Sequence, residues 1–93
     1  MNESAGNGQI PVGDAIGIAR DLLEQMVGKS PESVSGVNRS ENGWTISLDV
    51  VELARIPPST DLLASYDVSL DSRGDLVELT RARRYLRNQS DEE

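Results

Sequence analysis

The chain has 93 residues, a formal net charge of −7, 37% hydrophobic residues, and no cysteine, histidine or phenylalanine. This length allows one core of modest size and leaves little room for an enclosed pocket. The lack of cysteine excludes disulfides and thiolate metal sites. The negative charge opposes binding to nucleic acid or anionic membranes wherever the local charge does not reverse. No apolar run approaches a membrane span of roughly 18 residues, and no secretion signal is recognisable.

The two ends of the chain differ in composition from its middle. Residues 1–9 are small and polar, and residues 88–93 are polar and acidic. Neither segment can bury enough apolar surface to offset the entropy of ordering. We therefore expect a disordered arm at 1–9, a single α+β domain at 10–87 and a disordered acidic tail at 88–93.

A helical period covers residues 11–27. Proline suits the first helical turn, where Pro11 lies, and Gly28 can take the left-handed conformation that ends a helix. Apolar residues recur at three- and four-residue steps and should share the buried face. They are Val12, Ala15, Ile16, Ala19, Leu22, Leu23, Met26 and Val27.

After Pro31 the period becomes two, which indicates strands. Residues 33–40 predict a weak strand, in which Val34 and Val37 are the apolar residues, and the Glu-Asn-Gly sequence that follows predicts a hairpin turn. The next strand runs from Trp44 with alternating apolar residues, and its pattern slips at Val50-Val51, which predicts a bulge. Its inward residues are Trp44, Ile46, Leu48 and Val50.

A third strand is expected before Gly74 and a fourth after it. The inward residues of the third are Ala64, Tyr66, Val68 and Leu70. In the fourth we favour Val77 and Leu79 inward, unless a bulge after Gly74 reverses the faces. The expected fold is α+β: an N-terminal helix on a four-stranded antiparallel sheet, in two layers and in the order α-β-β-β-β. The open face should carry Thr45, Ser47, Asp49, Ser65, Asp67 and Ser69.

Little in the sequence suggests catalysis or metal binding. Without histidine and cysteine, the chain lacks the commonest general base, metal ligand and thiol nucleophile. Asp67, Asp71 and Asp75 are regularly spaced, but their spacing does not fit a calcium loop, and turn chemistry explains them better. We therefore expect no enzyme activity, no catalytic residue, no cofactor and no metal.

A basic segment near the end of the chain is the clearest candidate for a binding site. This arginine strip consists of Arg81, Arg83, Arg84, Tyr85 and Arg87. Strict alternation would place Arg81, Arg83 and Tyr85 on one side of the strand and Arg84 on the other. At least one of the arginines should reach a carboxylate of a neighbouring strand: Asp49, Glu52 or Asp67.

The order of several short motifs between Gly43 and Arg87 resembles the gas vesicle protein O family. A tryptophan strand leads to an acidic residue, an Arg-Ile-Pro element, an Ala-x-Tyr-x-Val strand, an Asp-x-x-Gly hairpin and an Arg-x-x-Arg-Tyr ending. Here they are Trp44, Glu52, Arg55-Ile56-Pro57, Ala64 to Val68, Asp71 with Gly74, and Arg81 with Arg84-Tyr85. The chain departs from the family at Leu79, where an aromatic residue is common, and in its short arm.

The resemblance implies a small accessory protein needed to form gas vesicles. It implies action through other accessory or shell proteins of the gas vesicle, without a small-molecule substrate, cofactor or membrane. A cytoplasmic location is expected, and association with gas vesicles is left open. Two alternatives remain: a small regulatory module that binds nucleic acid through the arginine strip, and a small binding or inhibitory domain for an unrelated ligand.

Overall fold

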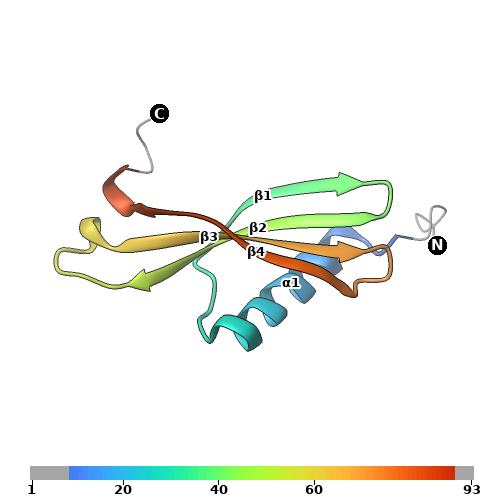
Figure 1. Ribbon diagram of the computed structural model, residues 1–93, viewed down its shortest axis with the longest axis horizontal. Helices are drawn as coiled ribbons and strands as arrows, with labels where there is room; N and C mark the ends of the chain where they lie inside the picture. Colours follow the sequence, from blue (N-terminus) through green and yellow to red (C-terminus); the bar gives the residue numbers. More distant parts are fainter. Residues whose placement is uncertain (1–8, 90–93) are drawn as a thin grey trace.

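A computed structural model describes residues 9–89, and Figure 1 shows their arrangement. The four strands form one antiparallel sheet in the order β1-β2-β3-β4, and the helix α1 packs against β2 and β3. This confirms the predicted α+β class. The elements are α1 (Val12–Val27), β1 (Ser33–Ser40), β2 (Gly43–Leu53), β3 (Leu62–Asp71), β4 (Leu76–Leu86) and the short 3-10 helices η2 (Pro58–Thr60) and η3 (Arg87–Gln89).

The proposed arm and tail fall mostly outside the described residues. Gln9 is the one arm residue that the structure describes, and it is buried. Asn88 and Gln89 belong to η3. Within residues 9–89, no helix is long and apolar enough to cross a bilayer.

Along the strand direction, the sheet has a part in which all four strands pair and a part that contains only β2, β3 and β4. β1 pairs only with Gly43–Asp49 of β2, whereas β2, β3 and β4 continue past that point. In Figure 1 the continuation ends at η2 and η3, away from β1. Arg81 and Arg83 lie level with the first residues of β1, whereas Arg84, Tyr85 and Arg87 lie in the part that β1 does not reach.

Small residues let the helix approach the sheet closely. Ala15, Ala19 and Leu23 are fully buried, one turn apart on the face that meets β2 and β3. The helix ends as predicted at Gly28, which has φ 85° and donates its N–H to the Glu24 carbonyl at 2.9 Å. Val12 and Met26, expected on the buried face, are instead 43% and 56% exposed, because they lie in the first and last turns.

The inward side chains of β2 and β3 form the core, as predicted. Ile46, Leu48, Val50, Ala64 and Val68 are fully buried, and Tyr66 and Leu70 are nearly so. The two strands approach so closely at Gly43 that a Cβ there would lie 1.9 Å from the Leu70 carbonyl oxygen. The first residue of β2 must therefore be glycine.

The prediction that Val77 faces inward is wrong. Ser69 pairs with Glu78 and Leu70 pairs with Leu76, so Val77 is an extra residue in β4 and is 65% exposed. This bulge turns Leu76 and Leu79 toward the core. Leu79 was predicted correctly. The bulge that the sequence left open after Gly74 is present, but it reverses the face of Val77 and not that of Leu79.

The bulge predicted in β2 is present one position later than expected. Val50 and Val51 pair in register with Ala64 and Leu63, and the shift comes between Val51 and Leu53. Glu52 is thus the extra residue, and its side chain turns to the helix side of the sheet, where it meets Tyr66. A carboxylate is thereby placed at the edge of the core.

Candidate functional site

A second bulge in β4 divides the arginine strip differently from the prediction. Ser65 pairs with Arg83 and Tyr66 pairs with Arg81, so Ala82 is the extra residue. Arg81 therefore lies on the helix side of the sheet, together with Arg84, which is opposite Ala64. The expectation that Arg81 shares a face with Arg83 and Tyr85 is wrong, because the bulge interrupts the alternation.

On the helix side, the Glu52 carboxylate contacts two residues of the strip, Arg81 and Arg84. Its carboxylate lies 2.9 Å from Arg84 Nε and 3.3 Å from Arg81 Nη1, and it accepts a hydrogen bond of 3.0 Å from the Tyr66 hydroxyl. The Glu52 side chain is 16% exposed, against about half for the two arginines. The prediction that an arginine of the strip reaches Glu52 is confirmed, although Glu52 belongs to β2 and the contact crosses β3.

Opposing effects act on the protonation of this cluster. Burial alone would raise the pKa of Glu52, but the hydrogen bond from Tyr66 and the charges of Arg84 and Arg81 outweigh it, so the pKa is lowered. Burial, reinforced by the Glu52 carboxylate, raises the pKa of the Tyr66 phenol. Glu52 is therefore charged and Tyr66 neutral near pH 7.

Arg87 joins three distant parts of the chain. Its guanidinium binds both carboxylate oxygens of Glu32, at 2.7 and 2.9 Å, and the Asp61 carboxylate at 3.0 Å. Asp61 also accepts the backbone N–H of Arg55 at 2.8 Å. The approach to β1, the loop before β3 and the end of β4 are thus fixed together.

In this second cluster, Arg87 and the two carboxylates stabilise each other's charged forms. The backbone hydrogen bond from Arg55, and then Arg87, lower the pKa of Asp61. The hydrogen bonds from Arg87 lower the pKa of Glu32, and the two carboxylates raise the pKa of Arg87. The sequence did not point to Glu32 or Asp61, because they stand in connecting segments without a periodic pattern and are far from Arg87 in the chain.

Arg83 and Tyr85 occupy the open face. The Arg83 guanidinium lies 4.6 Å from the centre of the Tyr85 ring, a cation–π contact. Burial, together with nearby Asp49, raises the pKa of Tyr85. Among residues 9–89, Arg83 has no carboxylate within ion-pair distance, unlike Arg81, Arg84 and Arg87.

The rest of the open face is mostly polar, and its side chains bond to one another. Thr45 meets Ser69 at 3.3 Å, and Ser47 donates to Asp67 at 2.7 Å. Ser65 was expected on the exposed face, but it is only 9% exposed. These contacts tie β2 to β3, whereas Arg83 is an exposed charged residue of the open face.

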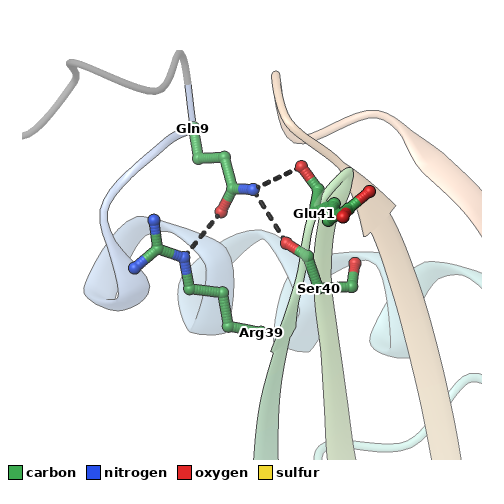
Figure 2. A pocket seen from close by; sticks show the side chains of 4 residues that line it. All are labelled: Gln9, Arg39, Ser40 and Glu41. Atoms are coloured by element: carbon green, nitrogen blue, oxygen red, sulfur yellow. Dashed lines mark hydrogen bonds between the residues drawn. The ribbon is translucent and has the colours of Figure 1, made fainter.

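A surface pocket lies at the opposite end of the sheet, beside the β1–β2 turn. Figure 2 shows the Gln9 amide between the carbonyl oxygens of Ser40 and Glu41, each 2.9 Å away, and Arg39, whose Nε lies 3.2 Å from Gln9 Oε1. The lining groups therefore already bond to one another. They fix the start of the fold to the hairpin turn, a structural role.

The aspartates that resemble a calcium loop have other contacts. Asp71 Oδ1 accepts the backbone N–H groups of Arg73 and Asp75, at 2.9 and 3.0 Å, and closes the β3–β4 turn. Asp67 bonds to Ser47 on the open face. Within the described part of the chain, no group of three acidic side chains is placed to hold a metal ion.

Comparison with known proteins identifies the family. The family model described as gas vesicle synthesis protein GvpO matches residues 1–91. The chain belongs to this family. Gas vesicle protein O from Streptomyces sp. (strain CB03234) is 49% identical over 69 residues, which are 74% of this chain and 54% of that protein.

A more distant relative comes from an archaeon. Gas vesicle protein O1 of Halobacterium salinarum (strain ATCC 700922 / JCM 11081 / NRC-1) is 31% identical over 75 residues, 81% of this chain and 60% of the relative. The chain thus spans between half and two thirds of the length of these two curated relatives. No solved structure matches the chain. The family resemblance predicted from the motifs between Gly43 and Arg87 is confirmed.

Proposed function

We propose that this chain is an accessory factor in gas vesicle synthesis that binds other gas vesicle proteins through the arginine strip, with Arg83 and Tyr85 at the centre of the contact. The observation that carries the proposal is the exposed Arg83 guanidinium, held over Tyr85 without an ion pair among residues 9–89. On a chain of net charge −7, such a group marks a local reversal of charge that attracts an acidic partner surface.

The other arginines extend this surface while holding the fold together. Arg81 and Arg84 have side chains that are 48% and 50% exposed. A guanidinium has five N–H donors, and each of these two uses only part of that number on Glu52. They can therefore donate to further carboxylates at the edge of the contact without releasing Glu52.

The division of the strip between two faces favours a protein partner over nucleic acid. A single-strand binder needs a continuous basic groove with several stacking platforms. Here Arg81 and Arg84 lie on the helix side, and Tyr85 is the one aromatic residue of the strip. The proposal includes no catalysis, and places the protein in the cytoplasm, where it meets its partners before or during shell formation.

A pairwise binding screen tests the proposal. Each of the other gas vesicle proteins of the source organism is immobilised in turn, and binding of the chain is measured at low and high salt. We expect at least one partner, weaker binding at high salt, and loss of binding for Arg83→Glu. Arg20→Glu is the matched control, because Arg20 is exposed on the helix and the charge change is identical. Salt-sensitive binding to DNA, with no protein partner, would contradict the proposal.

A further inference from the structure

The two edges of the sheet are protected to different degrees. β4 carries Arg81, Arg83 and Arg84, and bulges at Val77 and Ala82 interrupt its edge. Charges and bulges are the devices by which sheet edges avoid pairing with other chains. The end of β2 beyond β1 is also covered, because Lys29 Nζ donates to the Glu52 carbonyl at 2.9 Å.

The β1 edge has less of this protection. It has one bulge, at Ser35, and residues 36–40 pair with residues 43–47 without interruption. Its eight residues, Ser-Val-Ser-Gly-Val-Asn-Arg-Ser, include one charge and no proline. In the sheet it pairs with β2 alone, so the backbone groups on its outer side face away from the described sheet. Such a row of N–H and C=O groups is a template for another strand.

β1 also lies outside the cover of the helix. The helix packs on β2 and β3, and no residue of β1 is buried. Val34 and Val37 pair with the buried residues Leu48 and Ile46, so they belong to the helix side of the sheet, yet they are 37% and 39% exposed. A neighbouring strand would cover both the free backbone and these two valines.

We propose that the occupant of this edge is the β1 strand of a second copy of the chain, antiparallel and related by a two-fold axis. Pairing of β1 with β4 of another copy would leave free edges and extend indefinitely, whereas β1–β1 pairing closes. It also removes the less protected edges and leaves the two arginine-bearing β4 strands outermost. In the register that joins apolar side chains, Val37 faces Val37 of the second copy.

This arrangement has a consequence for docking. Because β4 lies at the opposite edge of the sheet from β1, a second copy at β1 would leave Arg83 and Tyr85 of each copy uncovered. If the strip binds as proposed above, the dimer presents two such sites and gains affinity from simultaneous engagement. The dimer depends only on pairing at the β1 edge. A failure of binding through the strip would therefore leave the dimer proposal unaffected.

Sedimentation of the 93-residue chain without any partner tests the inference. We expect a reversible rise from the mass of one chain to that of two between low micromolar and near-millimolar concentration. Val37→Lys places two lysines opposite each other and should weaken the dimer about tenfold. Val77→Lys, the same change on the other edge strand, should leave it unaltered. A single-chain mass at every concentration would overturn the proposal, and so would equal effects of the two lysines.

Two single-cysteine variants test the dimer if Val37→Lys does not fold. The natural chain has no cysteine, so each variant carries one thiol. Directly opposed residues of antiparallel strands have Cα atoms about 4.5–5.5 Å apart, which suits a disulfide. Val37→Cys should form a covalent dimer under mild oxidation, and Val77→Cys should not. Preferential cross-linking at Val77 would place the contact at β4 and refute the β1 dimer.

Discussion

Arg84, on the edge strand β4, lies 2.9 Å from Glu52, the bulged residue of β2, across the intervening strand β3. Two strand irregularities make this contact possible. The shift at Glu52 turns its carboxylate to the helix side, and the shift at Ala82 brings Arg81 to the same face. The basic residues of the strip are therefore partly structural, which separates the roles of its members.

Removal of the Glu52 charge should destabilise the fold. Glu52→Gln leaves two arginines beside a neutral amide and weakens the hydrogen bond from Tyr66. We expect a loss of about 1–3 kcal/mol in the free energy of unfolding, measured by urea denaturation. Glu78→Gln is the control, because Glu78 is exposed on β4, and it should change the free energy little. Equal stability of both variants would show that the Glu52 cluster contributes nothing.

Stability should fall in acid. The pKa values of Glu32, Glu52 and Asp61 are lowered in the folded protein. A carboxylate with a lowered folded pKa stabilises the fold fully above its unfolded pKa, near 4, and this stabilisation is lost as the pH falls through the folded value. We therefore expect a constant midpoint of thermal unfolding from about pH 6 to pH 8 and a decline below about pH 4.5.

The contribution of Arg87 to the loss of stability in acid can be measured separately. Arg87→Met removes the charge that lowers the pKa of Glu32 and Asp61, so the variant should be less stable at neutral pH and lose less stability in acid. An acid decline as steep as that of the natural chain would mean that other carboxylates dominate.

Packing of the helix against the sheet should depend on Leu23. This side chain is fully buried against the sheet, so Leu23→Ala should reduce the free energy of unfolding by about 2–5 kcal/mol. Met26→Ala, one turn away at a residue that is 56% exposed, should cost less than about 1 kcal/mol. Similar losses at both positions would indicate that the helix is packed in a different rotation.

Two glycine substitutions should act in opposite directions. Gly43→Ala forces a Cβ against the Leu70 carbonyl oxygen and should destabilise by at least about 2 kcal/mol. Gly17→Ala meets nothing within 4 Å in the helix and should stabilise by about 0.5–1 kcal/mol. Thermal unfolding of the two variants checks both signs, and stabilisation by Gly43→Ala would contradict the close approach of β2 and β3.

Periodicity in the sequence was sufficient to predict the fold class. The helical spacing of Ala15, Ala19 and Leu23 and the alternation in β2 and β3 each describe a face that is buried against one partner, which is what periodicity reports. The pattern failed in β4, because an edge strand buries little and two bulges change its parity. Alternation from the inward Leu79 placed Arg81 correctly on the helix side, but it placed Val77, Arg83, Arg84 and Tyr85 on the wrong faces.

The sequence pointed to the residues of the arginine strip but not to their arrangement. Charge density pointed to the strip, and cross-strand pairing pointed to Glu52. The contacts of Arg87 were not foreseeable, because they join Glu32 and Asp61 from loops whose positions depend on the whole fold. The Arg83–Tyr85 contact follows from alternation within a segment that the bulge does not interrupt.

The most direct test of the central claim compares Arg83→Glu and Arg84→Glu in two measurements, affinity for a gas vesicle partner and free energy of unfolding. Arg83→Glu should weaken binding about tenfold at low salt and leave stability within about 0.5 kcal/mol, because Arg83 makes no ion pair within residues 9–89. Arg84→Glu should lower stability through Glu52. Unchanged binding by folded Arg83→Glu would contradict the account.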